Sequence, residues 1–372
     1  MKQMAAKMFH SLILDDGSTA VLEPEGETLP TPERLRDKFG RAITDLRVSV
    51  TDRCNYKCVY CRTGNEGAQY TELPIADYLR MVRLFVSLGV EKVRLTGGEP
   101  LLRSGLVEMV RELAGMRTAY LPDGSYVGEN GLPLDLALTT NGHLLEGLAQ
   151  PLRDAGLNRV TVSMDAVDAE TFAAITRVPR SFDKVMAGIR RAQDVGLGPV
   201  KVNCVLLRGF NDGQIEQFAE FSRREGVIVR FIEWMPLEED RSWKRETVIS
   251  LDEIVERLNA YRPLVELAPH AASETAKRFT FDDGVGEIGI VAPVSRPFCG
   301  HCSRVRLTSD GKIRTCLFSQ SDHDLQGEMV RGGTDEELIA YIRKIVMRKE
   351  ARHHIGEPGF EKPSRNMVHI GG

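Results

Sequence analysis

The sequence predicts an α/β protein: a partial (β/α)6 TIM-like barrel followed by a smaller C-terminal α+β domain. Two observations support this fold. Strand-like runs with a two-residue period alternate six times with helical patterns, and 372 residues are enough for a barrel with an appended domain. The strands are expected at 45–51, 92–97, 136–141, 160–165, 200–206 and 228–233, and the helices at 74–88, 104–114, 143–155, 168–176, 181–195 and 211–225. Because eight strand–helix units close a full barrel, six leave one side open.

The predicted domains are an N-terminal extension over 1–40, the barrel over 41–245 and the C-terminal domain over 246–372. The extension has a turn signal at Asp15, Asp16 and Gly17, and its stretch from Pro24 to Pro32 is rich in Glu, Thr and Pro. We expect no chemistry there. A turn-rich insertion at 116–135 precedes the third strand.

The composition is that of an ordinary globular protein, with 42% hydrophobic and 27% charged residues. A net charge of -4 argues against a nucleic-acid footprint over the whole molecule. The sequence shows neither a long apolar run nor a signal-peptide pattern, so we expect a cytoplasmic protein with no membrane partner. Six of the seven cysteines fall into two tight groups, which suits metal binding better than disulfides.

The first cysteine group lies in the loop after the first strand and comprises Cys54, Cys58 and Cys61. Three thiolates this close can bind three irons of a cubane cluster and leave the fourth iron open. Zinc sites combine a cysteine pair with a partner pair elsewhere, so a third cysteine at this spacing argues against zinc. The alternative is three unconnected buried thiols.

Basic residues recur on one face of the predicted barrel strands. Apolar and polar residues alternate along each strand, and the polar face is expected to line the barrel interior. The cations on that face are Arg47, Lys92, Arg94, Lys201 and Arg230. Unpaired cations in a closed cavity are strongly unfavourable, so these residues indicate a polyanionic ligand such as a triphosphate. The alternative is an exposed or ion-paired strand face. Cys204 lies on the apolar face and is expected to be a buried, inert thiol.

The second cysteine group has the spacing C-x2-C-x13-C and comprises Cys299, Cys302 and Cys316. Two interpretations remain open: a second 4Fe–4S cluster with an open iron, or a zinc ribbon with His301 or His323 as fourth ligand. Between the cysteines, Arg304 and Arg306 lie on one face of a short strand, and Gly311 predicts a hairpin turn after it.

The first cysteine group, with its C-x3-C-x2-C spacing, resembles that of radical S-adenosylmethionine (SAM) enzymes, and the segment Gly97-Gly98-Glu99-Pro100 resembles their G-G-E-P motif. The resemblance implies that SAM binds the open iron and is cleaved by one electron to a 5′-deoxyadenosyl radical. The SAM contacts that it implies are Tyr60, Gly98, Ser163 and Met235. From the sequence alone, the glycine pair is equally compatible with a simple turn.

Both cysteine groups, the R-x-R between Cys302 and Cys316, and a final Gly371-Gly372 together resemble the GTP 3′,8-cyclase family of molybdenum cofactor biosynthesis. The resemblance covers residues 40–372 and implies a second cluster whose open iron binds guanine. The radical would take hydrogen from ribose C3′, and C3′ would attack C8 to give 3′,8-cyclo-7,8-dihydro-GTP. The implied GTP contacts are Arg47, Lys92, Arg94, Thr139, Lys201, Arg230, Arg304, Val305 and Arg306, and the implied catalytic residues are Arg304, Arg306, Gly371 and Gly372.

The same resemblance implies partners: an electron donor such as flavodoxin or ferredoxin, the downstream cyclic pyranopterin monophosphate synthase, and a second copy of the chain in a homodimer. The extension and the 116–135 insertion depart from the family's usual form but touch no motif. Two alternatives remain: a peptide-modifying radical SAM enzyme with an auxiliary cluster, and a non-catalytic metal-cluster scaffold. For the Gly-Gly end, the alternative is a frayed terminus.

Two further motifs predict structure without function. The G-x-G-x-x-G pattern over 284–289 precedes a strand rather than a helix, so we expect a β-hairpin instead of a dinucleotide site. Residues 334–350 predict a packing helix with a capping box at Thr334. The pair His353-His354 lies in a polar tail and is expected to be solvated.

Overall fold

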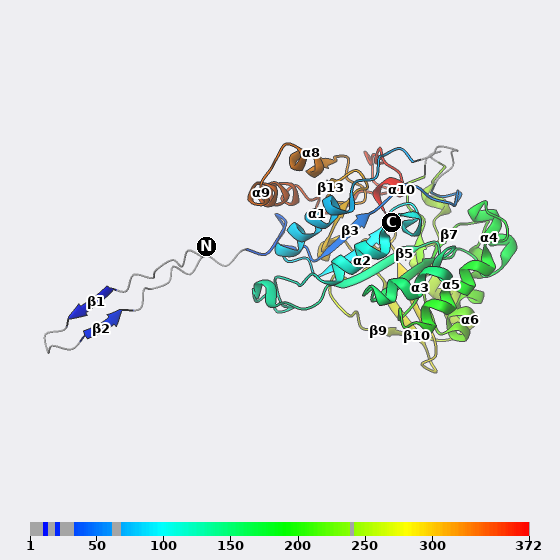
Figure 1. The fold of residues 1–372 in the computed structure, drawn as a ribbon. Coiled ribbons are helices and arrows are strands. Elements are labelled where there is room, and N and C mark those ends of the chain that lie inside the picture. The colour runs from blue at the N-terminus through cyan, green and yellow to red at the C-terminus, as the bar shows by residue number, and fades with distance from the viewer. Residues whose placement is uncertain (1–9, 14–18, 23–32, 62–67, 239–241, 372) are drawn as a thin grey trace. The chain divides into compact units, whose positions relative to one another are not determined.

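The computed structural model describes residues 10–13, 19–22, 33–61, 68–238 and 242–371 (Figure 1). The chain forms two compact units, Met1–Glu33 and Arg34–Gly372. In the first unit, β1 (His10–Ile13) pairs with β2 (Thr19–Leu22) in antiparallel orientation. The turn predicted at residues 15–17 and the whole stretch from Pro24 to Pro32 lie outside the described residues. Both cysteine groups lie in the second unit.

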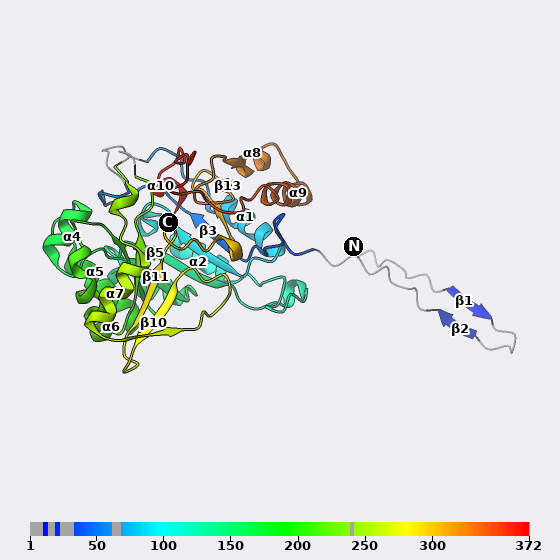
Figure 2. The same cartoon turned by 180° about the vertical axis from the view of Figure 1, so that it is seen from behind.

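Six parallel strands form the centre of a twelve-stranded sheet in chain order. They are β3 (Asp45–Ser49), β4 (Lys92–Thr96), β5 (Asp135–Thr140), β6 (Arg159–Ser163), β7 (Lys201–Leu206) and β8 (Ile228–Glu233). The helices between them are α1 (Ile75–Ser87), α2 (Leu106–Ala114), α3 (Leu145–Asp154), α4 (Ala169–Thr176), α5 (Phe182–Asp194) and α6 (Ile215–Glu225). Figures 1 and 2 show α3, α5 and α6 on the outside of the strands. The predicted barrel class is confirmed.

The C-terminal residues extend this sheet at both edges (Figure 2). Strand β12 (Arg304–Leu307) pairs in parallel with β3, and β11 (Glu287–Val291) pairs in parallel with β8. Beyond them lie β13 (Lys312–Arg314) and β14 (His323–Asp324) on one side, and β10 (Lys277–Phe281) and β9 (Leu264–Leu267) on the other. These strands satisfy the backbone groups that β3 and β8 would otherwise expose at the open side of the barrel.

The remaining C-terminal helices are α7 (Leu251–Tyr261), α8 (Leu325–Val330), α9 (Asp335–Val346) and α10 (Met367–Ile370). Single 3-10 turns occur at η1 (Pro100–Leu102), η2 (Gly128–Asn130), η3 (Asp212–Gln214), η4 (Arg245–Thr247) and η5 (Cys299–His301). Within the described residues, every helix is too short or too polar to traverse a lipid bilayer.

The core lies between the apolar strand faces and the helices. Val48, Val93, Val160 and Val202 are fully buried, as the alternation predicted. Cys204 is also fully buried, and the amide of Asn211 lies 3.7 Å from its sulfur, so the buried-thiol prediction is confirmed.

Several local predictions are also confirmed. Gly284 and Gly286 have positive φ angles in the turn between the antiparallel strands β10 and β11, which is the expected hairpin. Thr334 and Glu337 form the predicted capping box of α9. The insertion at 116–135 folds back on itself through the isolated bridges Arg117↔Pro133 and Tyr120↔Tyr126.

Candidate active site

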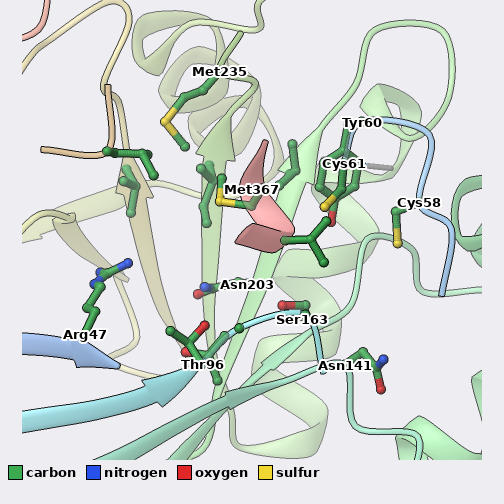
Figure 3. A pocket seen from close by; sticks show the side chains of 18 of the residues that line it. Arg47, Cys58, Tyr60, Cys61, Thr96, Asn141, Ser163, Asn203, Met235 and Met367 are labelled. Carbon is green, nitrogen blue, oxygen red and sulfur yellow. The ribbon is translucent and has the colours of Figure 1, made fainter. Parts of the chain in front are cut away.

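A cavity opens at the carboxyl ends of the barrel strands (Figure 3). Its walls come from the loops after β3 to β8, from the C-terminal strands and from α10. The labelled side chains in Figure 3 are Arg47, Cys58, Tyr60, Cys61, Thr96, Asn141, Ser163, Asn203, Met235 and Met367. This is where the active sites of (β/α) barrels lie, because the loops that follow parallel strands converge there.

The first cysteine group, Cys54, Cys58 and Cys61, lines this cavity, and none of its three thiols forms a disulfide. Backbone hydrogen bonds hold their loop against the end of α4, from the N–H of Lys57 to Thr176 and from the N–H of Val59 to Ile175. Burial raises the pKa of Cys58, with Asp165 and the other two thiols adding to the effect. Among the described residues, no three His, Cys, Asp or Glu side chains converge on a point that would hold a single metal ion. A cubane needs no such convergence, because each thiolate binds a different iron.

The glycines of the G-G-E-P segment are required by this cysteine loop. A Cβ on Gly97, whose φ is +140°, would lie 2.2 Å from the carbonyl oxygen of Thr51. A Cβ on Gly98 would lie 2.2 Å from the carbonyl oxygen of Arg53. The N–H of Gly98 donates to Thr51 at 2.8 Å, so the two loops pack backbone against backbone.

Glu99 connects the same segment to the end of β5. Its carboxylate accepts hydrogen bonds from the N–H of Leu101 (2.9 Å), the hydroxyl of Thr140 (2.7 Å) and the N–H of Asn141 (2.7 Å). The side chain is fully buried, and burial raises its pKa to about 7 although these donors oppose the rise. Glu99 had no individual role in the sequence analysis, and these hydrogen bonds show that it holds the loops around the cavity together.

The predicted SAM contacts Tyr60, Gly98, Ser163 and Met235 all line the cavity. The hydroxyl of Tyr60 donates to Asp165 at 2.8 Å, and the other carboxylate oxygen of Asp165 accepts from the N–H of Val205 at 2.8 Å. Asp165 therefore orients the tyrosine ring from the end of β6. Burial raises the pKa of Asp165 to about 6. The sequence analysis assigned no role to Asp165, because its contact with Tyr60 joins residues distant in the chain.

Four arginines form one row across four neighbouring strands. In the strand register, Arg314 of β13 lies opposite Arg306 of β12, Arg306 lies beside Arg47 of β3, and Arg47 lies beside Arg94 of β4. Burial lowers the pKa of Arg47 to about 9 and that of Arg94 to about 10. Arg94 donates to Thr139 and Thr161, whereas the Nε of Arg47 is buried without a hydrogen-bond partner. In the described part of the chain, Arg314 has an ion pair with Asp322, but no carboxylate pairs with the other three.

The predicted interior cations do not all behave alike. Arg47 and Arg230 line the cavity, whereas Lys92, Arg94 and Lys201 are not among its lining residues. Two of the five also have carboxylate partners, since Lys92 pairs with Asp45 at 3.1 Å and Arg230 with Glu274 at 3.9 Å. The expectation of unpaired cations is therefore wrong for Lys92 and Arg230. Asp45 pairs with Lys92 because the two residues lie opposite each other in the β3–β4 register.

The second cysteine group lies just behind the cavity wall. Its neighbours Arg304, Arg306 and Leu317 line the cavity, but Cys299, Cys302 and Cys316 themselves do not. All three thiols are free. Although burial opposes it, the guanidinium of Arg304 and the ammonium of Lys349 lower the pKa of Cys302 to about 7.

Two buried cations that the sequence did not single out hold this second group in place. Arg41 donates to the carbonyl of Cys299 at 2.7 Å. Lys349 donates to the carbonyl of Arg304 at 2.8 Å and to that of Thr315. Their only sequence signal is charge, which does not distinguish a buried anchor from a solvated side chain.

The C-terminal tail enters the cavity. Met367 and Val368 line it, and the carbonyl of Gly371 accepts a hydrogen bond from Arg306. Gly371 has a φ of +77°, and a Cβ there would lie 2.3 Å from the hydroxyl of Ser49. Gly372 lies outside the described residues.

Comparison with known proteins agrees with this geometry. Residues 48–222 match the Radical SAM superfamily, and residues 227–355 match the family Molybdenum Cofactor Synthesis C. The chain is 44% identical over 331 residues to a GTP 3′,8-cyclase of Acidothermus cellulolyticus, with 86% of this chain and 87% of the relative covered. The chain belongs to the GTP 3′,8-cyclase family. It is also 39% identical over 344 residues to the family member of Streptomyces coelicolor, with 91% and 96% covered.

The fold of this GTP 3′,8-cyclase family member is also found in a distant solved structure. Streptococcus suis SuiB bound to precursor peptide SuiA aligns with a TM-score of 0.59 at 14% identity, covering 88% of this chain and 77% of that one. At this identity the likeness concerns the fold alone. Membership of the radical SAM superfamily means that the chain uses SAM and a 4Fe–4S cluster. The three thiols of the first cysteine group line the cavity outside any disulfide, and they fit that cluster.

Proposed function

We propose that this protein converts GTP into 3′,8-cyclo-7,8-dihydro-GTP, the first step of molybdenum cofactor biosynthesis. The observation that supports this best is the row of arginines beside the cavity that also receives the first cysteine group. Like charges on adjacent strands repel, so Arg306, Arg47 and Arg94 together favour a bound polyanion. A nucleoside triphosphate supplies that charge.

The first cysteine group, Cys54, Cys58 and Cys61, would hold the cluster to which SAM binds. When bound, the cluster and SAM supply a 5′-deoxyadenosyl radical that takes hydrogen from the ribose C3′. Tyr60, fixed by Asp165, would contact the adenine together with Met235, and Ser163 and Gly98 would hold the methionyl and ribose parts. Each of these residues lines the cavity, which supports the proposal.

GTP would lie between the first cysteine group and β12. Arg47 and Arg230 reach the cavity directly, and Glu274 would release Arg230 when phosphate binds, because a triphosphate is the stronger partner. Thr139 also lines the cavity, and Arg94, Lys92 and Lys201, which are not among its lining residues, would add positive potential to the GTP site. Arg304 and Arg306 would contact ribose and base, with the backbone of Val305 between them.

The second cysteine group, Cys299, Cys302 and Cys316, would hold a second 4Fe–4S cluster whose open iron binds guanine. The three free thiols and the two cations that brace their loops support this assignment, because a cluster with thiolate ligands is anionic. Zinc with His301 or His323 remains the alternative outcome. With the second cluster in place, the catalytic residues would be Arg304, Arg306, Gly371 and Gly372.

Water must be kept from a carbon-centred radical. A small apolar cluster of Leu237, Val294, Phe318 and Ile355 lies on the C-terminal side of the cavity. Met235 and Met367 pack against this cluster and line the cavity at the same time. We infer that this cluster and the tail exclude solvent during the reaction.

The proposal includes partners and organisation. One electron per SAM must come from a donor, for which flavodoxin or ferredoxin is suited, and the product would pass to cyclic pyranopterin monophosphate synthase. We expect a homodimer that acts in the cytoplasm. We retain 1–40, 41–245 and 246–372 as the proposed extension, barrel and C-terminal domain.

The decisive experiment incubates anaerobically reconstituted protein with SAM, dithionite and GTP. We expect 5′-deoxyadenosine together with an isomer of GTP, and about eight irons per chain for two cubanes. ATP is the matched control, since it has the same triphosphate and a different base. Deoxyadenosine without a GTP isomer would contradict the proposal and favour a peptide substrate. About four irons with one zinc would establish the zinc ribbon.

A further inference from the structure

We propose that Arg365 is a positioning residue that clamps the C-terminal segment, residues 360–371, over the cavity. It does so by joining the hairpin of the second cysteine group to the loop of the first. The inference rests on the proposed function only where it concerns coupling of the reaction. The anchoring itself is a property of the fold.

The clamp begins with two carboxylates around one buried guanidinium. The Nη1 and Nη2 of Arg365 donate to the two oxygens of Asp310 at 2.8 and 2.9 Å. Its Nε lies 2.5 Å from an oxygen of Asp322. The Arg365 side chain is only 6% exposed. A planar guanidinium matched by a carboxylate through two parallel bonds fixes direction as well as position.

The two aspartates belong to the second cysteine group's own hairpin. Asp310 lies in the turn between β12 and β13, and Asp322 precedes β14. Asp322 also pairs with Arg314, the outermost member of the arginine row. The position of Arg365 is therefore set by the same strands that present Arg304 and Arg306.

The face of the guanidinium rests on the first cysteine group's loop. Its carbon lies 4.4 Å from the ring centroid of Tyr70, which is within the range of a cation–π contact. The ring of His369 meets the same tyrosine edge-on at 5.2 Å. The N–H of Tyr70 donates to Asp52, two residues before Cys54. Tyr70 thus connects the clamp to the loop that would hold the SAM cluster.

The tail needs an anchor upstream of its glycines. Gly371 has no side chain, and its carbonyl contact to Arg306 depends on where α10 is held. Lys362, 3.6 Å from Glu238, and Phe360, against Phe318, hold the start of the segment. Between these contacts and Gly371, Arg365 holds the segment through its ion pairs with Asp310 and Asp322. Loss of this clamp would release α10 without loosening residues 360–362.

The first test uses hydrogen–deuterium exchange on the full-length protein with its clusters. In Arg365→Ala, the amides of 366–371 should exchange at least about tenfold faster than in the wild type. Arg352→Ala is the matched control, because Arg352 is half exposed and pairs with Glu357 in the same C-terminal region. Unchanged exchange in Arg365→Ala, or equal acceleration in the control, would overturn the clamp.

A second pair of variants tests the Tyr70 ring, which contacts both Arg365 and His369. Tyr70→Phe keeps the ring and should leave the exchange of 366–371 unchanged, whereas Tyr70→Leu should accelerate it. This pair decides the question if Arg365→Ala does not fold, because Asp310 and Asp322 keep their arginine. Acceleration in both variants, or in neither, would contradict a role for the ring.

Coupling provides the readout that a merely structural residue would not change. With SAM, dithionite and GTP, Arg365→Ala should raise the ratio of 5′-deoxyadenosine to cyclised product by about tenfold, since a loosened site lets the radical take hydrogen from donors other than the ribose. Arg365→Lys, which keeps one charge but loses the fork, should give an intermediate ratio. A wild-type ratio in Arg365→Ala despite faster exchange would reduce the clamp to a structural contact. If the wild type formed no cyclised GTP, the proposed function would fail while the exchange data still tested the anchor.

Discussion

Arg306, Arg47 and Arg94 lie side by side on three neighbouring strands, where like charges repel. Arg94 and Arg306 are buried and Arg47 is partly buried at the cavity, and desolvation lowers the pKa of all three. Repulsion and desolvation of these arginines destabilise the protein while the site is empty. Binding of an anionic ligand offsets that cost, so such a row is tolerated where the charge serves binding. The same logic explains why Arg314, at the end of the row, has its own aspartate.

Replacing one member of the row should separate stability from binding. In Arg47→Met, we expect the free energy of unfolding without GTP to rise by on the order of 1 kcal/mol, because a buried cation with an unpaired Nε is removed. The rise in melting temperature caused by GTP should disappear. Differential scanning fluorimetry with and without GTP measures both. A loss of stability without GTP would show that Arg47 is a structural residue.

Arg306→Ala should have a different effect, which product analysis can measure. We expect cyclisation of GTP to be abolished while SAM cleavage continues uncoupled. The reason is that Arg306 is proposed to contact GTP, whereas SAM is proposed to bind at the first cysteine group. Arg304→Ala should behave in the same way. Simultaneous loss of 5′-deoxyadenosine and cyclised product would show that these arginines support the fold rather than the reaction.

Lys201 predicts a pH dependence of GTP affinity. Burial, together with repulsion from Arg230 and Arg159, lowers its pKa to about 8. A triphosphate favours the protonated ammonium, so affinity should decline by up to about tenfold per pH unit above 8 as that charge is lost. Isothermal titration at pH 7 and 9 tests this. Lys201→Met should bind GTP more weakly at pH 7 and show a flatter profile, whereas Lys277→Met, exposed and paired with Glu266, should retain the wild-type profile.

At the scale of elements, the loop after β4 and the loop after β3 behave as one unit. Gly97 and Gly98 approach the backbone of Thr51 and Arg53 so closely that no side chain fits. Backbone atoms cannot move aside as a flexible side chain can. The G-G-E-P segment therefore determines the shape of the cysteine loop in addition to any contact with SAM.

Gly97→Ala should for this reason disturb the first cluster. We expect reduced iron content and a lower melting temperature, because a Cβ would stand 2.2 Å from the Thr51 oxygen at a φ of +140°. Gly147→Ala in α3 is the matched control, since nothing lies within 4 Å of that Cβ. It should raise the free energy of unfolding by about 0.5–1 kcal/mol. Normal iron content in Gly97→Ala would contradict the proposed link between the loops.

The sequence predicted the barrel elements well because strand and helix periods are local properties. For example, 228–233 was expected and β8 spans Ile228–Glu233. The pairing of β11 with β8 and of β12 with β3 could not be predicted, because edge pairing joins segments far apart in the chain.

At the site, motifs located the cysteines and cavity residues. The Asp45–Lys92 ion pair could have been anticipated, because Asp45 lies two residues before Arg47 and therefore on the same strand face as the cations. Asp165, Lys349 and Arg365 act through tertiary contacts that have no local pattern.

At the scale of the whole molecule, the C-terminal residues complete the barrel as well as the site. Ile288 and Ile290 of β11, and Val305 and Leu307 of β12, are at most 1% exposed. Burying each such side chain contributes roughly 1.5–3 kcal/mol, so four contribute about 6–12 kcal/mol as an upper estimate. That sum is comparable to the whole stability of a typical domain, about 5–15 kcal/mol.

Truncation tests this dependence. A chain of residues 34–245 would expose the edges of β3 and β8 together with the apolar surface that β11 and β12 cover. We expect it to aggregate or to lack a cooperative unfolding transition, and to retain little iron after reconstitution. A chain of residues 34–372 is the control, because Arg34–Gly372 is a compact unit by itself, and it should match the full-length protein in melting temperature and iron content. If residues 34–245 instead formed a cooperatively folding monomer with about four irons, the barrel would be complete without its C-terminal strands, and the role assigned to β11 and β12 would be wrong.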